Sequence, residues 1–187
     1  TKLSSDITLQ PIKRFNLDSA IIFSDILLVP YALGQSINFD SQTGPKLSKF
    51  NLNNFLDKNE KEFNKKLDPI YKAIEITRKK LNKDKSLISF VGAPWTLLIY
   101  MLDFKVNRTV IDINKLNNEY SKLNIIIDKL IKYLCTHIKN QINAGADVVQ
   151  IFDSWAGLIP EKNIKEFCYI PNTKIIEFCK KKKIPNI

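Results

Sequence analysis

Residues 21–34 read IIFSDILLVPYALG, a run that begins as a strand and carries Ser24 and Asp25 in its middle. The apolar residues on either side of these two occupy both faces of the expected strand, a pattern typical of a parallel strand covered on both sides. We therefore expect a buried strand over residues 19–29, ended by Pro30. An unpaired carboxylate in such a strand is costly, so the aspartate needs a structural or chemical reason.

Two further buried strands are expected, SLISFVG at residues 86–92 and DVVQIF at residues 147–152. Helical patterns separate the strands, which is typical of βα units with right-handed crossovers and a parallel sheet. No glycine-rich phosphate-binding motif follows any strand, so the sequence offers nothing for a nucleotide-binding sheet. Polar side chains recur instead where strands end, which is where a TIM barrel places its active site: Ser24, Asp25, Thr96, Tyr100, Asp153 and Ser154.

The segments between the strands also carry readable signals. A short helix is expected to precede the first strand, and the polar residues 40–44 predict the turn of a hairpin. Asp68 and Pro69 are typical of an N-cap and a first-turn proline, so we expect the helical pattern over residues 55–81 to be interrupted there. The other expected helices cover residues 5–15, residues 114–143, and the stretch from 161 to 183 with a break near Pro171.

The composition favours a globular protein and argues against a membrane-spanning segment and a zinc site. The chain has 187 residues, 44% hydrophobic and 26% charged, without an apolar run of the roughly 20 residues that span a bilayer. We expect a cytoplasmic protein that does not act on a membrane. Its three cysteines lack metal-ligand spacing and are expected to be reduced core residues, and a zinc site built around the single histidine, His137, would lack ligands.

The net charge of +10 raises the question of nucleic acid. The lysines, however, are spread along helical patterns without interleaved aromatic residues, which is typical of a solvated surface. We therefore expect no nucleic-acid partner. A basic surface also suits an anionic small-molecule substrate.

The length predicts an incomplete barrel. Three full strands and the start of a fourth at residues 184–187 account for about three to four βα units, whereas an eight-stranded barrel takes on the order of 250 residues. The expected fold is therefore α/β, a partial TIM (β/α)8 barrel in which residues 1–187 form one incomplete domain. We expect the chain to be a fragment cut at both ends.

Three long motifs, in order, resemble one family. The stretches IIFSDILLVPYALG with INFDSQTGPKL, FVGAPWTLLIYML and AGADVVQIFDSWAG are similar to uroporphyrinogen decarboxylases, and so is the lead-in TLQPIKRFNLDSAIIFSD. The resemblance covers essentially the whole chain. It implies a TIM barrel that removes the carboxyl groups of the four acetate side chains of uroporphyrinogen III, giving coproporphyrinogen III in haem biosynthesis, without metal or organic cofactor.

The resemblance also implies roles for four residues. Asp25 would accept hydrogen bonds from the pyrrole N–H groups and stabilise a cationic ring, and such a preorganised carboxylate is a strong electrostatic catalyst. Tyr100 would place its hydroxyl near the substrate and this aspartate. Ser154 would contact a substrate carboxylate, and Phe152 would pack on the macrocycle. Without the motif, a capping or salt-bridging role would be the favoured reading of Asp25 and core packing that of Tyr100, while Phe152 fits core packing nearly as well as substrate contact.

Two parts of the family pattern are missing from the chain. The arginine-rich N-terminal motif, expected to bind substrate carboxylates, is absent, and Arg14 does not match it. A histidine from the last part of the barrel is absent too. Phe23 and Ser24 are expected to line or support the site. The chain alone is therefore expected to be inactive, and the parent enzyme to form a homodimer.

Two other readings remain open at this stage. A corrinoid or thiol methyltransferase of the same superfamily would bind zinc near the last barrel strands, a region that the sequence does not contain. A basic binding module would need this segment to be stable alone, although an open partial barrel leaves unpaired sheet edges.

Overall fold

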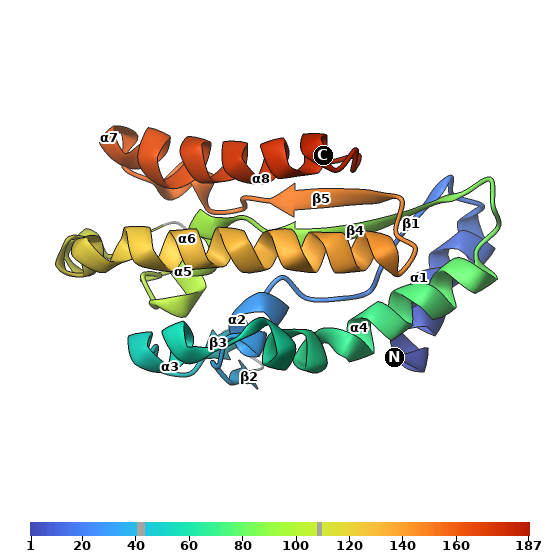
Figure 1. Cartoon of the computed structure of the whole chain (residues 1–187), viewed down its shortest axis with the longest axis horizontal. Helices are drawn as coiled ribbons and strands as arrows, with labels where there is room; N and C mark the ends of the chain where they lie inside the picture. Colours follow the sequence, from blue (N-terminus) through green and yellow to red (C-terminus); the bar gives the residue numbers. More distant parts are fainter. Residues whose placement is uncertain (41–43, 108–109) are drawn as a thin grey trace.

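Three parallel strands form the central sheet of the computed structural model, in the order β1-β4-β5 (Figure 1). The structure describes residues 1–40, 44–107 and 110–187. In the sheet register, Ile21 pairs with Ile88, and Ile88 pairs with Val148. The strands are β1 (Ser19–Ile21), β4 (Ser86–Gly92) and β5 (Val148–Phe152).

The end of the chain adds a fourth parallel segment beside β5. Asn186 forms a parallel bridge with Val149, whose N–H donates to the Pro185 carbonyl at 3.1 Å. The fourth strand expected over residues 184–187 is therefore present as an isolated bridge. Consecutive parallel strands joined by helical crossovers confirm the α/β class and the partial TIM barrel.

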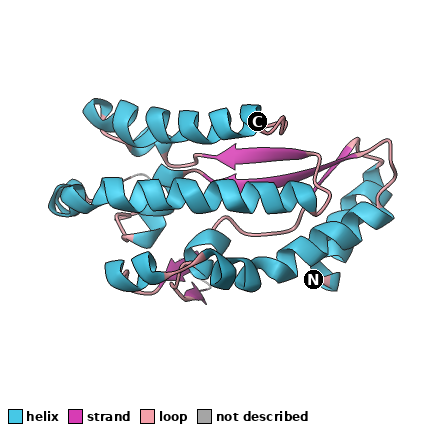
Figure 2. Cartoon of the chain, in the orientation of Figure 1, coloured by secondary structure: helices cyan, strands magenta, loops and turns pink. Residues whose placement is uncertain are grey.

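Helices cover one face of the sheet, as Figure 2 shows. Side chains alternate along β4, so Leu87, Ser89 and Val91 are buried while Ile88 and Phe90 are only partly covered. The main covering helices are α1 (Lys2–Phe15), α4 (Glu60–Lys80), α6 (Ile113–Asn143) and α8 (Ile170–Lys181). The largest fully buried side chains are Trp95, Phe63, Phe104 and Phe167.

The strand expected over residues 19–29 is much shorter than predicted. β1 ends at Ile21, and the chain then turns into a short helix, α2 (Leu28–Ala32). The turn forms because the Asp25 carboxylate accepts the N–H of Leu27 at 2.7 Å. Pro30 was expected to stop a strand, but it lies in the first turn of α2, where its missing N–H costs nothing.

The expected hairpin is present. β2 (Ile37–Asp40) pairs antiparallel with β3 (Gly44–Leu47). The turn predicted between them falls largely on residues 41–43, which lie outside the described residues.

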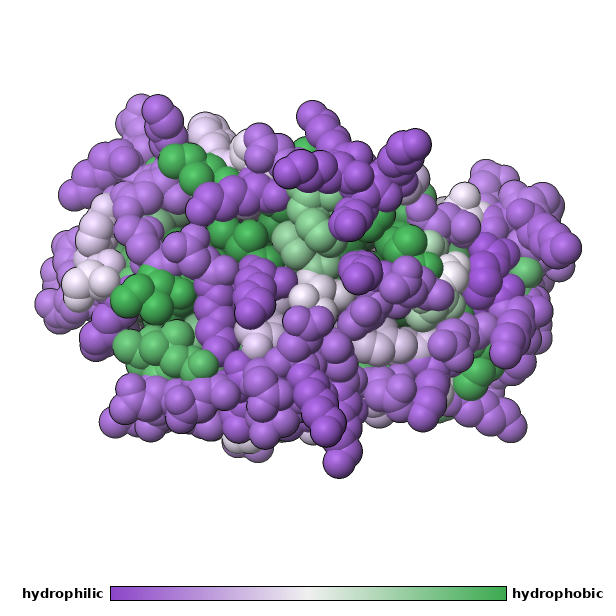
Figure 3. All heavy atoms as spheres, viewed as in Figure 1, coloured by the Kyte–Doolittle hydropathy of each residue, from purple (hydrophilic) through white to green (hydrophobic). Residues whose placement is uncertain are grey.

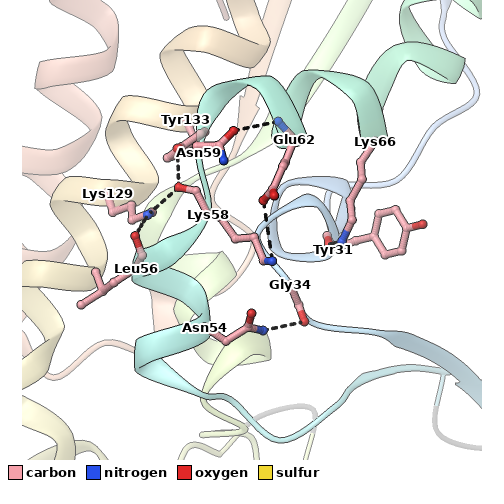
Figure 4. Close-up of polar contacts among 10 residues, drawn as sticks. All are labelled: Tyr31, Gly34, Asn54, Leu56, Lys58, Asn59, Glu62, Lys66, Lys129 and Tyr133. Carbon is pink, nitrogen blue, oxygen red and sulfur yellow. Dashed lines mark hydrogen bonds and ion pairs between the residues drawn. The ribbon is translucent and has the colours of Figure 1, made fainter.

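The break in the helical pattern after the hairpin lies ten residues earlier than expected. Lys58 is the C-cap of α3 (Leu52–Asp57), and Asn59 caps α4 by accepting the Glu62 N–H at 3.0 Å (Figure 4). Lys129 and Tyr133 of α6 donate to the Lys58 carbonyl at 3.0 and 2.8 Å, which satisfies an orphan acceptor at the helix end.

Asp68 and Pro69, the predicted interruption, lie inside a continuous α4. The predicted interruption at these residues was wrong. The helical pattern breaks at Lys58 instead, where α6, some 70 residues away in the chain, supplies the hydrogen-bond donors. Packing of the apolar face of α4 outweighs the hydrogen bond that the proline removes.

The break expected near Pro171 takes the form of a π-helical turn. η2 (Lys165–Tyr169) separates α7 (Glu161–Ile164) from α8, and the proline follows in the first turn of α8. Two short helices complete the described elements: α5 (Pro94–Met101) after β4, and η1 (Ala156–Leu158) after β5.

None of the helices in the described part of the chain is long and apolar enough to cross a membrane. Hydrophilic side chains cover most of the face seen in Figure 3, with apolar groups mainly in the band between α6 and α8. All three cysteines are free thiols, as expected; Cys168 and Cys179 are buried, and Cys135 is half-buried.

Candidate active site

β4 and β5 end together, with Gly92 paired to Phe152, and this carboxyl end forms one edge of the sheet. β1 ends earlier, opposite Ile88, and the chain after it continues toward the same edge. The Ala93 N–H donates to the Phe152 carbonyl at 2.8 Å and ties the end of β4 to the end of β5. A Cβ built on Gly92 would lie 3.2 Å from Cβ of Ile26, so the segment after β1 closes against the end of β4. The sequence-predicted polar residues therefore gather at this edge.

Asp25 stands half-buried between β1 and α2. Its Oδ1 accepts the Leu27 N–H at 2.7 Å, and its carbonyl receives the Leu28 N–H at 3.4 Å. Within the described residues no cation forms an ion pair with this carboxylate. The carboxylate therefore closes a local turn before α2, whose N-cap is Leu27, and does not cap the helix itself. This contact occupies one carboxylate oxygen, and the other accepts no hydrogen bond from a described residue.

Two side chains of α1 hold the segment that leads to Asp25. The Phe23 N–H donates to Thr8 Oγ1 at 2.9 Å, and Ser4 Oγ donates to the Phe23 carbonyl at 2.6 Å. The Phe23 side chain itself is 57% exposed, and Ser24 is half-buried. Both expected lining residues thus lie at the edge, and the anchoring role of α1 is an addition that sequence reasoning missed.

Tyr100 lies in the last turn of α5, half-buried against the segment that follows β5. Its ring packs edge-to-face on Trp155, with 6.0 Å between centroids. In the described part of the chain no hydrogen bond joins its hydroxyl to Asp25. The two residues therefore belong to segments that reach the same edge, and among the described contacts no hydrogen bond joins them.

Phe152 and Ser154 flank the end of β5. The Phe152 ring packs edge-to-face on Phe90, with 5.5 Å between centroids, and Ser154 is exposed. Phe90 lies on the same partly covered face of the sheet, and sequence reasoning did not single it out. Its signal was the alternation of SLISFVG, which turns Phe90 away from buried Val91.

Asp153, between these two residues, fixes the segment after β5. Its carboxylate accepts hydrogen bonds from Thr96 Oγ1 at 2.8 Å, Cys168 Sγ at 3.0 Å and Asn172 Nδ2 at 3.0 Å. Burial, and then the hydrogen bond and charge of Asp153, raise the pKa of Cys168 to about 12. The aspartate points into the helices, which leaves Ser154 facing solvent.

The backbone of Trp155 is held as firmly as the aspartate. Its N–H donates to Thr96 Oγ1 at 3.2 Å, and its carbonyl accepts the Trp95 indole N–H at 3.0 Å. Among the described residues, no group of three or more His, Cys, Asp or Glu side chains is arranged to hold a metal ion. The groups that the motif residues offer at this edge are one open carboxylate, hydroxyls and aromatic faces.

Comparison with known proteins identifies the relatives of the chain. The model of the family described as uroporphyrinogen decarboxylase (URO-D) matches residues 1–187. The chain belongs to the uroporphyrinogen decarboxylase family. It is 45% identical over 186 residues to the uroporphyrinogen decarboxylase of Orientia tsutsugamushi (strain Ikeda) and 44% identical over 183 residues to that of Rickettsia bellii.

These alignments cover 98% and 95% of the chain but 54% and 52% of the relatives, so the chain spans about half the length of the curated decarboxylases it matches. A solved structure of a methyltransferase from Methanosarcina mazei shares the fold, with a TM-score of 0.77 at 15% identity. The superposition covers 99% of the chain and 55% of the methyltransferase. At this identity the likeness concerns the fold alone.

Proposed function

We propose that the protein is a uroporphyrinogen decarboxylase whose substrate binds at the carboxyl edge of β1, β4 and β5. The observation that carries the proposal is the position of Asp25, on a family motif and at this edge, with one oxygen held by Leu27 and the other open. A carboxylate fixed in this way keeps its orientation without being neutralised by a protein cation.

The reaction replaces each acetate carboxylate by a proton. Protonation of a pyrrole carbon makes the ring cationic; the bond between the methylene carbon and the carboxylate then breaks, CO₂ leaves, and its electron pair flows into the ring. A second proton on the methylene carbon and loss of the first restore the pyrrole with a methyl group. Asp25 would accept pyrrole N–H bonds and stabilise the cationic ring, because a fixed charge in a partly desolvated site acts without reorganisation.

The other predicted residues take supporting roles in the proposal. The hydroxyls of Tyr100 and Ser154 are open to substrate oxygens. Phe152, on the partly covered face of β5, offers an apolar surface to the macrocycle. The net charge of +10 favours the approach of a polyanionic substrate.

The test uses the protein made from the intact gene, incubated with uroporphyrinogen III without oxygen. Products with seven to four carboxylates are separated after oxidation. The variant Asp25→Asn keeps an oxygen for the Leu27 N–H but removes the charge, and we expect kcat/KM to fall by about 10²–10³. Asp84→Asn makes the same charge change at an exposed residue at the opposite end of β4 and is expected to leave the rate unchanged.

Two results would overturn the proposal. One is a folded protein that removes no carboxyl group from uroporphyrinogen. The other is an Asp25→Asn variant as active as Asp84→Asn.

A further inference from the structure

Lys105 places a positive charge at the candidate site that the motifs did not indicate. It lies in the connection between α5 and α6, and its side chain is half-buried. Its ammonium lies 5.7 Å from the centroid of the Tyr100 ring and 5.4 Å from that of Trp155. A cation over aromatic faces at these distances is attracted by both rings.

The two aromatic rings beside the Lys105 ammonium, and the Lys105 backbone, are held in place. Trp155 is held through its backbone by Thr96 and Trp95, and Tyr100 packs on it edge-to-face. The backbone of Lys105 forms an antiparallel bridge with Ile111. The ammonium is therefore positioned by packing rather than by a counter-ion.

No acceptor satisfies this ammonium in the described part of the chain: Lys105 takes part in no ion pair, and its Nζ donates no hydrogen bond to a described residue. Lys129 makes the informative contrast. It too lies over two aromatic rings, those of Phe55 and Tyr133, but it donates to the Leu56 and Lys58 carbonyls (Figure 4). Lys129 closes the end of α3, whereas no described residue accepts a hydrogen bond from the three ammonium N–H donors of Lys105.

We propose that Lys105 binds a carboxylate of the substrate, a role that rests on the proposed function. Tyr100 and Trp155 set the position of the ammonium, and exposed Ser154 directly precedes Trp155 in the chain. A carboxylate arm of a tetrapyrrole bound at this edge would meet the cation of Lys105. A charge-assisted hydrogen bond formed there is stronger than a neutral one. Lys105 thus positions the macrocycle by binding one of the macrocycle's carboxylate side chains, and it takes no proton from the ring.

The test measures binding and turnover with the protein made from the intact gene. Uroporphyrin, the stable oxidised octacarboxylate, serves as the probe, and quenching of tryptophan fluorescence reports its dissociation constant. Lys105→Met keeps the apolar stem on the rings and removes the charge, with Lys105→Gln as a second neutral variant. Lys105→Arg restores the charge, and Lys83→Met removes one from an exposed residue in the turn before β4.

We expect both neutral variants to bind uroporphyrin about tenfold more weakly, the loss of one charge-assisted contact. Lys105→Arg is expected to recover most of this affinity, and Lys83→Met to match the wild type. With uroporphyrinogen, the neutral variants should raise KM by a similar factor and change kcat little, because the contact is made equally in the ground and transition states.

Wild-type affinity in folded Lys105→Met and Lys105→Gln would overturn the role of Lys105 while leaving the decarboxylase proposal intact. An equal loss in Lys83→Met would also overturn it, since the effect would then come from overall charge. A wild-type protein that neither binds uroporphyrin nor acts on uroporphyrinogen would overturn both proposals together.

Discussion

Acidification from pH 7 to pH 5 should destabilise the fold through His137, the one histidine of the 187 residues. His137 of α6 is 3% exposed, and burial lowers its pKa from 6.5 to about 3. Gln141 Nε2 lies 3.1 Å from His137 Nε2 and also donates to the Phe90 carbonyl at 3.1 Å. An amide nitrogen can only donate, so His137 Nε2 accepts a hydrogen bond from Gln141. The proton of the neutral ring therefore sits on Nδ1, which faces the Tyr71 hydroxyl 3.0 Å away.

Protonation of this buried ring would direct a second N–H at the Gln141 amide nitrogen, which cannot accept it. The unfolded chain has no such obstacle and takes up a proton below its pKa of about 6.5. Because the unfolded state then binds more protons, the free energy of unfolding decreases as the pH falls below 6.5 and continues to decrease until the folded-state pKa of about 3. Between pH 7 and pH 5 this loss amounts to about 2 kcal/mol.

The measurement compares wild type with His137→Gln by urea unfolding at both pH values, followed by circular dichroism. Carboxylates titrate in both proteins, so the difference between the two pH dependences isolates the histidine. Tyr71 does not contribute, because burial raises its pKa to about 12. The imidazole NMR resonance of His137, assigned by its absence from the His137→Gln variant, should not titrate in this range. Equal pH dependences, or an imidazole that titrates near pH 6.5 in the folded protein, would refute the reasoning.

Three further outcomes are expected from the described contacts. Asp153→Asn should lower the free energy of unfolding by about 1–3 kcal/mol in urea titrations, because an amide replaces a carboxylate that accepts three hydrogen bonds. Gly145→Ala should cost about 1–3 kcal/mol, since φ is +110° and the new Cβ would lie 2.9 Å from Arg78 Cγ, whereas Gly157→Ala meets nothing within 4 Å and should be nearly neutral. Cys168, with its pKa raised to about 12, should react with iodoacetamide at pH 8 far more slowly in the native protein than in urea, as mass spectrometry would show.

Helices and strands were predicted correctly where the local sequence pattern determines them. The expected strand 86–92 coincides with β4, and the helix expected over residues 114–143 differs from α6 by one residue. Both have strong periodicity and clear ends. The strand expected over residues 19–29 failed because composition does not show where a side chain turns back on its own backbone, as Asp25 does with Leu27.

The break between α3 and α4 was not predictable for a different reason. Lys58 ends α3 because Lys129 and Tyr133 supply donors from α6, and no local pattern contains that contact. The same applies to the site. Asp25 and Tyr100 stood in recognisable motifs. The role of Lys105 follows only from the folded structure, in which α5 and the segment after β5 place two aromatic rings beside its ammonium.

The two faces of the sheet explain how an aspartate can follow a buried strand. Ala20 and Ile22 are buried under helices, whereas Ile21 and Phe23 are 52% and 57% exposed on the opposite face. In a closed TIM barrel that face is filled by layers of apolar side chains, and polar groups begin where the strands end. Asp25 lies just past that limit, so its carboxylate avoids the full desolvation of the interior and keeps a fixed direction through its hydrogen bond with the Leu27 N–H.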